Sequence, residues 1–128
     1  MNQLLGLGTD IIECLRIRRM IEKHSESFLL RVYTPSEIHQ CQERRHSTEH
    51  FAAFWAAKEA VFKALGTRWR KGMNWTDIEI QLRPGGETVA ELRGLARELG
   101  AAKGIREVRV TIAYCRAYAT AHALAMGD

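Results

Sequence analysis

The 128-residue chain has little of what usually staples a small protein or carries it into a membrane. Its three cysteines, Cys14, Cys41 and Cys115, are far apart and without a CxxC or Cys/His pattern, which argues against a zinc site and for reduced thiols. No apolar run approaches the ~18 residues of a membrane span, and no basic region with an apolar core opens the chain. We therefore expect a cytoplasmic protein without membrane contact, folded as a single domain over residues 1–128.

Positive charge exceeds negative charge, with 19 Lys and Arg against 15 Asp and Glu. The excess gathers in residues 16–23, 44–45 and 68–71. This distribution implies an anionic partner, which is nucleic acid, an acidic protein or a phosphorylated small molecule. The chain has no RNA-binding sheet signature and no interleaved exposed aromatic residues, which disfavours nucleic acid.

The most uniform stretch is FAAFWAAKEAVFKAL, residues 51–65. At about 100° per residue its bulky side chains gather on one face and its alanines on the other, so we expect a buried helix whose alanine face admits a close backbone neighbour. Only Lys58, Glu59 and Lys63 are charged. Glu59 and Lys63 have the spacing of an ordinary surface ion pair, whereas Lys58 either reaches out along its stem or needs a buried partner. The helix alone leaves ion pair and functional site equally open.

The pattern over the whole chain predicts an α+β domain with a mainly antiparallel sheet. The expected order is strand, three helical pieces, two strands, helix and two strands. The strands are expected at residues 4–12, 77–82, 88–92, 107–114 and 118–126. The helical pieces are expected at residues 15–24, with a helical or irregular continuation to 32, and at residues 35–45, 51–65 and 94–99.

Capping signals mark several helix ends. Thr34 and Glu37 have the spacing of a capping box, and Ser or Thr at residues 47–48 is placed to cap the central helix. Gly66 and Gly100 stand where C-terminal glycines end helices.

The first predicted helix is basic and amphipathic. Leu15, Met20 and Ile21 mark its inner face, with Arg16 and Arg19 outside. The charged side is either a solvated face or a docking surface for an acidic partner.

Two carboxylates interrupt apolar segments, Asp10 in the first strand and Glu59 in the central helix. If strand and helix pack together, these carboxylates can share one Mg²⁺, which commonly takes one or two protein carboxylates and fills its remaining positions with water and phosphates. Lys63, one turn beyond Glu59, would face the same phosphates. Pairing of Asp10 with a basic side chain is the plainer alternative.

Several segments then carry a family resemblance. They are GLGTDIIE (6–13) followed by RI (16–17), RVYTPSE (31–37), WAAKEA (55–60), KALGT (63–67) and DIEI (77–80). In this order they resemble the motifs of the holo-acyl-carrier-protein synthases, the small bacterial 4′-phosphopantetheinyl transferases, over essentially the whole chain. The resemblance implies the fold of that family. It also implies Mg²⁺-dependent transfer of the phosphopantetheine arm of coenzyme A to a serine of an acidic apo acyl carrier protein, in fatty acid biosynthesis. Adenosine 3′,5′-bisphosphate would be released, and family members form homotrimers with sites between subunits.

The resemblance also implies residue roles. The catalytic residues are Asp10, Glu59 and Lys63; the first two also hold the metal, and Lys63 activates the serine or neutralises the transferring phosphate. The residues expected at the coenzyme are Arg44, Arg45, Lys58, Gly66, Thr67, Thr111 and Tyr114. Of these, the two arginines are assigned to the 3′-phosphate, and Gly66 and Thr67 line the phosphate path through backbone groups. The residues expected at the carrier are Arg16, Arg19, Met20 and Arg31.

Three positions depart from the family pattern. Tyr114 stands where a histidine is usual, Phe54 replaces an arginine, and Arg68 replaces a glycine. His122, on the adjoining predicted strand, is a candidate replacement for the missing imidazole, with a structural role as the alternative. These departures motivate an alternative function, a catalytically impaired relative that only binds a carrier protein or coenzyme A.

Overall fold

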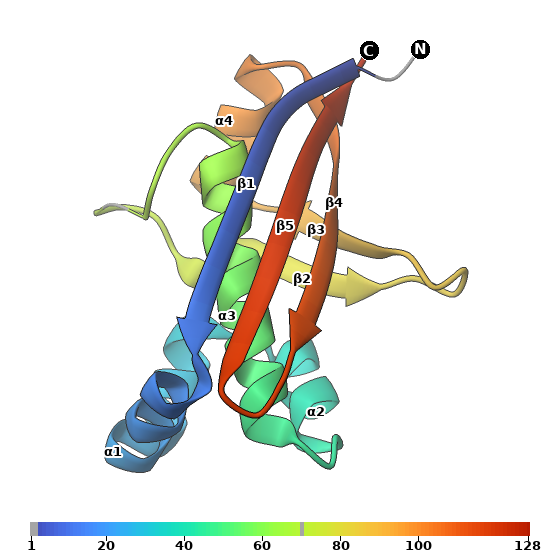
Figure 1. Ribbon diagram of the computed structural model, residues 1–128. Coiled ribbons are helices and arrows are strands. Elements are labelled where there is room, and N and C mark those ends of the chain that lie inside the picture. Colours follow the sequence, from blue (N-terminus) through green and yellow to red (C-terminus); the bar gives the residue numbers. More distant parts are fainter. Residues whose placement is uncertain (1–2, 70) are drawn as a thin grey trace.

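The computed structural model describes residues 3–69 and 71–128, so Arg70 of the third basic segment lies outside the described residues (Figure 1). In chain order the elements are β1 (Gln3–Glu13), α1 (Cys14–Val32), α2 (Pro35–Gln42), α3 (Ser47–Ala64), the 3₁₀ turn η1 (Trp75–Asp77), β2 (Ile78–Leu82), β3 (Thr88–Leu92), α4 (Gly94–Ala102), β4 (Ile105–Tyr114) and β5 (Tyr118–Gly127). The predicted α+β class and the predicted order of strands and helices are confirmed. Within the described ranges, no helix combines the length and the apolarity that crossing a membrane requires.

The strands form one antiparallel sheet in the order β1-β5-β4-β3-β2. Only Val89 and Arg109 pair β3 with β4 in the described part of the sheet. The β2–β3 hairpin therefore turns away and runs across the direction of the other three strands (Figure 1). Helix α3 packs along one face of β1 and β5. On the opposite face, which we call the open sheet face, Leu7 and Ile11 of β1 are 62% and 63% exposed.

Small residues let α3 lie unusually close to the sheet. A Cβ atom on Gly8 would lie 1.9 Å from the carbonyl oxygen of Ala60, and one on Gly6 would lie 2.0 Å from that of Ala64. Alternate residues of β5 that face the same helix are fully buried alanines: Ala119, Ala121, Ala123 and Ala125. The close backbone neighbour expected for the alanine face is therefore the chain's own sheet, and no subunit contact is needed to explain that face.

The helix ends follow part of the predicted pattern. The capping box of Thr34 and Glu37 is present at the start of α2. Gly66, with φ of 79°, ends α3 in a Schellman motif, in which its N–H donates to Lys63 O and the Thr67 N–H donates to Phe62 O. Helix α3 begins at Ser47 with His46 as N-cap and no side-chain cap, so the prediction of a Ser or Thr cap was wrong.

Two predicted helix ends were also wrong. Helix α2 ends at Gln42, and Arg44 and Arg45 lie in the turn before α3. Helix α4 continues past Gly100 to Ala102. Gly100 serves packing, because a Cβ there would lie 3.1 Å from a methyl group of Leu92.

Helix α1 is broken at Ser25, whose φ is 47°. Its buried residues are Cys14, Ile17, Phe28 and Val32. Leu15 and Met20 are exposed, so their predicted place on the inner face was wrong. The helix follows β1 directly, and the Cys14 N–H donates to Ala117 O at 2.9 Å, which fixes its rotation about its axis.

Candidate active site

Asp10, Glu59 and Lys63 meet where β1 packs on α3. The Lys63 ammonium donates to Asp10 Oδ1 at 3.0 Å and to Thr9 O at 2.9 Å. Glu59, one turn earlier on α3, is half-buried. Burial and then the Asp10 charge raise the pKa of Glu59, while Lys63 and Arg68 act in the opposite direction. The structure thus brings the three predicted catalytic residues together.

The donor set of this cluster fits a hard cation, because both carboxylates offer oxygen ligands. Across the described residues, no group of three or more His, Cys, Asp and Glu side chains is arranged to hold a metal. An ion held by Asp10 and Glu59 would therefore take its remaining ligands from water and substrate. The Asp10–Lys63 pair is partly exposed, with side-chain exposures of 18% and 46%. Such pairs contribute only about 0–1 kcal/mol, so exchanging the Lys63 contact for a metal costs little.

A second cluster lies between α2, α3 and the β2–β3 hairpin. There a cavity of about 60 Å³ is lined by Arg44, His50 and Phe54, by the polar Gln40 and Thr88, and by apolar residues of the sheet. The His50 ring is T-shaped against the Tyr114 ring, with centroids 5.1 Å apart, and lies 6.1 Å from the Phe54 ring. Phe54, which replaces the family arginine, is thus a buried wall of this cavity.

The two clusters lie on opposite sides of α3. His50 and Glu59 are nine residues apart on one helix, which corresponds to about 180° around its axis. A single chain therefore does not bring the arginine and tyrosine candidates to Asp10 and Glu59.

The late strands divide the remaining coenzyme candidates between two faces. Residues alternate along β4, so Thr111 faces the open sheet face, while Tyr114 faces His50 on the helix side. His122 pairs with both Thr9 and Thr111 and shares their face. It therefore lies on the other side of the sheet from Tyr114, and within one chain it does not replace an imidazole at that position.

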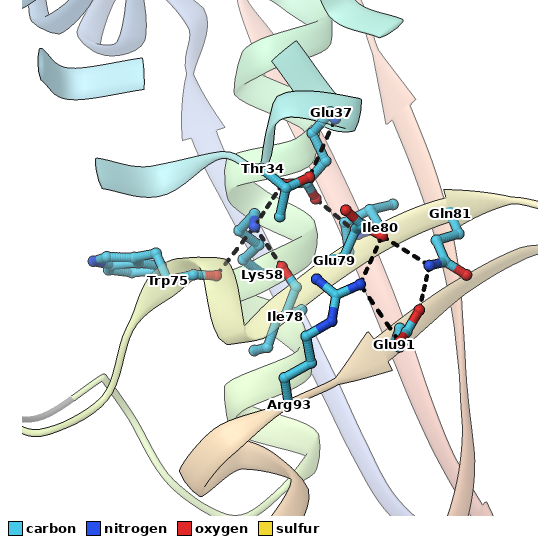
Figure 2. A network of polar contacts seen from close by, with 10 residues as sticks. All are labelled: Thr34, Glu37, Lys58, Trp75, Ile78, Glu79, Ile80, Gln81, Glu91 and Arg93. Carbon is cyan, nitrogen blue, oxygen red and sulfur yellow. Dashed lines mark hydrogen bonds and ion pairs between the residues drawn. The ribbon is translucent and has the colours of Figure 1, made fainter. Parts of the chain in front are cut away.

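Lys58 does not belong to either cluster. Its side chain is completely buried, and its ammonium contacts Glu37 Oε1 at 2.8 Å, Ile78 O at 2.5 Å and Trp75 O at 3.1 Å (Figure 2). Burial lowers the pKa of Lys58, and Glu37 opposes that shift. An ammonium has three donors, and all three are used here. The expectation that Lys58 binds the coenzyme was therefore wrong.

Glu37 is the residue that sequence reasoning missed. Its Oε1 accepts from Thr34 N as well as from Lys58, and its Oε2 accepts from Ile80 N at 2.7 Å. Figure 2 shows these contacts continuing across β2 and β3 through a second pair, Glu79 with Arg93, 3.2 Å apart. The sequence offered one indication of this pair: it contains a capping-box glutamate, Glu37, and a lysine expected to be buried, Lys58, for which no partner had been assigned.

Gly66 and Thr67 do not offer free amide groups. Their N–H groups are both used in the Schellman motif, and the Thr67 hydroxyl donates to Arg68 O at 3.1 Å. These two N–H groups are therefore not free to donate to a phosphate. That backbone groups of Gly66 and Thr67 line the phosphate path stays a prediction. The four carrier candidates are all exposed on α1: Arg16, Arg19, Met20 and Arg31.

The sequence model of the 4′-phosphopantetheinyl transferase superfamily matches residues 6–119. The holo-[acyl-carrier-protein] synthase of Rhodopirellula baltica is 43% identical to this chain over 119 residues, which cover 93% of the chain and 94% of that protein. The chain therefore belongs to the 4′-phosphopantetheinyl transferase superfamily, in the family of the holo-[acyl-carrier-protein] synthases.

Solved structures of this family have the same fold. The holo-[acyl-carrier-protein] synthase of Neisseria meningitidis matches with a TM-score of 0.85 at 27% identity, covering 96% of this chain and 98% of that one. The Helicobacter pylori enzyme in complex with coenzyme A matches with a TM-score of 0.80 at 28% identity, covering 93% and 98%.

Proposed function

We propose that this chain transfers the 4′-phosphopantetheine arm of coenzyme A to a serine of an acidic apo acyl carrier protein and releases adenosine 3′,5′-bisphosphate. The observation that carries the proposal is the meeting of Asp10, Glu59 and Lys63 in a member of this family. The Helicobacter pylori relative, solved with coenzyme A, supports coenzyme A as co-substrate. Three free thiols support a reducing, cytoplasmic setting, and the exposed basic residues of α1 suit an acidic carrier.

In the proposed reaction the carrier serine oxygen bonds to the phosphorus that carries the arm. The bond from that phosphorus to the nucleotide phosphate breaks, and the serine proton is released. Asp10 and Glu59 would hold Mg²⁺, which supplies positive charge to the phosphates when bound. Lys63, already within reach of Asp10, neutralises the transferring phosphate or activates the serine. Phosphoryl transfer depends mainly on positioning and charge stabilisation, so this small set of groups can supply the main part of the catalysis.

The test is incubation with coenzyme A, Mg²⁺ and apo carrier protein, read by the intact mass of the carrier. We expect the carrier mass to increase by one phosphopantetheine arm. If several carriers stay unmodified while a known family enzyme modifies them, the proposal is wrong. Omission of Mg²⁺ with added chelator should stop the transfer, which tests the metal dependence.

We further propose that the working unit is a homotrimer with sites between subunits. The separation of the Glu59 and Arg44 clusters by α3 supports a site assembled from two copies. The apolar residues Leu7 and Ile11 on the open sheet face, 62% and 63% exposed, support association through that face.

Complementation between inactive variants tests the shared site. The proposed site takes Glu59 from one copy and Arg44 from another, so Glu59→Gln and Arg44→Glu each disable one side of it. A co-refolded mixture of the two variants would contain some interfaces in which both residues are intact. Random mixing restores roughly a quarter of the sites. No recovered transfer from a mixture shown to be hetero-oligomeric would mean that each chain carries its own site. Sedimentation analysis gives the number of copies.

A further inference from the structure

His50 holds an unused hydrogen-bonding atom in the second cluster. Its side chain is 8% exposed, and its Nδ1 is the buried side-chain nitrogen or oxygen without a hydrogen-bond partner among the described residues. Leaving such an atom unpaired destabilises a folded chain, and native structures contain few of them. An unpaired buried nitrogen beside a cavity therefore indicates a partner that arrives with a ligand.

The surroundings of His50 define what that ligand offers. Arg44 lines the same 60 Å³ cavity, and the other walls include the apolar Phe54, Ile80 and Ile112. Burial and then the Arg44 charge lower the pKa of His50. The lowered pKa of His50 favours the neutral imidazole, which carries one N–H, beside the permanent cation of Arg44. A group with acceptor oxygens and negative charge satisfies both at once.

We propose that His50 is a specificity-determining residue, whose Nδ1–H donates a hydrogen bond to the 3′-phosphate of coenzyme A beside Arg44. This inference rests on the proposed function and on the role at that phosphate that the family resemblance implies for Arg44. An anion that neutralises Arg44 also removes the charge that disfavours a proton on His50. Phe54 lies one turn after His50 on the same side of α3 and replaces the arginine that is usual in the family. The phenylalanine cannot donate a hydrogen bond to the phosphate, whereas the imidazole of His50 can.

His50→Phe and His50→Asn separate the hydrogen bond from the ring. Phenylalanine keeps the aromatic packing on Tyr114 but removes the nitrogen, whereas asparagine can place an amide N–H near the position of Nδ1. His39→Phe is the matched control, because His39 is exposed on α2 and pairs only with Glu43 in the described structure. KM and kcat are measured for each variant with coenzyme A and with 3′-dephospho-coenzyme A.

We expect His50→Phe to raise KM for coenzyme A about tenfold or more, as loss of a hydrogen bond to a charged group does. KM for 3′-dephospho-coenzyme A and both kcat values should stay unchanged, and His50→Asn should recover most of the loss. The melting temperature of His50→Phe should not fall, because the variant removes an unpaired buried nitrogen. Equal effects on both coenzymes, or a lower melting temperature with unchanged KM, would show that His50 only packs.

Calorimetry keeps the inference testable if no carrier is modified. Wild-type and His50→Phe proteins are titrated with adenosine 3′,5′-bisphosphate and with adenosine 5′-monophosphate. A preference of the wild type for the bisphosphate that His50→Phe loses supports the inference even when transfer fails. Equal affinities in the two proteins, or no binding of either nucleotide, overturn it.

Discussion

Replacing Lys58 by methionine tests the buried ion pair at the centre of the molecule. Lys58→Met keeps an unbranched apolar stem but removes the ammonium from Glu37 Oε1, 2.8 Å away, and from two backbone carbonyls. Breaking a buried pair by removing one partner costs about 3–5 kcal/mol, and small domains are stable by only about 5–15 kcal/mol. We therefore expect a loss of a large part of the free energy of unfolding, measured by urea denaturation at fixed protein concentration.

A double variant and a matched control identify the cause of that loss. Adding Glu37→Gln removes the carboxylate charge that Lys58→Met leaves unpaired, so the double variant should lose about 1–3 kcal/mol less than the sum of the two single variants. Lys63→Met is the control, because Lys63 is on the same helix and pairs with a carboxylate near the surface, where a pair contributes about 0–1 kcal/mol. Additive losses, or equal losses at Lys58 and Lys63, would refute the reasoning.

Four further outcomes follow from the geometry. Glu59→Gln should abolish carrier modification while leaving the urea midpoint near that of the wild type. At limiting Mg²⁺, wild-type activity should fall on acidification at a pH above the ordinary carboxyl pKa, because the pKa of Glu59 is raised in the metal-free chain. Gly8→Ala should lower the free energy of unfolding by about 1–3 kcal/mol, because a Cβ there meets Ala60 O at 1.9 Å. Arg16→Glu with Arg19→Glu should raise KM for the carrier, flatten its salt dependence and leave KM for coenzyme A unchanged.

Some local signals in the sequence predicted the local structure, although the expected cap of α3 and the expected ends of α2 and α4 were wrong. The capping box of Thr34 and Glu37 and the terminal Gly66 each depend on residues within a few positions of one another, and both are present as predicted. The partner of Lys58 was not predictable in this way. Glu37 is 21 positions earlier in the chain. Its carboxylate was already assigned to the capping box with Thr34, so it was not considered as a partner for Lys58. Only the packing of α2 on α3 and β2 shows that one carboxylate serves Thr34, Lys58 and Ile80 together.

The sequence spacing places His50 and Glu59 on opposite sides of one helix, but an error in the predicted start of that helix hid this separation. The central helix was expected to start at residue 51, which left His50 outside it, whereas α3 begins at Ser47. Once His50 belongs to the helix, its nine-residue separation from Glu59 places the two about 180° apart. The meeting of Asp10, Glu59 and Lys63 was predictable because each charge interrupts an apolar segment, whereas His50 interrupts none. Its signal, an unpaired buried nitrogen, exists only in three dimensions.

The position of each charged or titratable residue around the axis of α3 explains what that residue contacts. The alanine side is occupied by the glycines of β1 and the alanines of β5, so no charge can lie there. Lys58, on the side toward α2 and β2, is enclosed and can only serve the fold. Glu59 and Lys63 emerge at the β1 edge, where solvent and a phosphate can reach them, and His50 emerges on the opposite side beside Arg44. A helix buried against a sheet cannot rotate to bring these two sides together. A ligand that contacts both sides would therefore bridge two copies of the chain, as in the homotrimer that we propose.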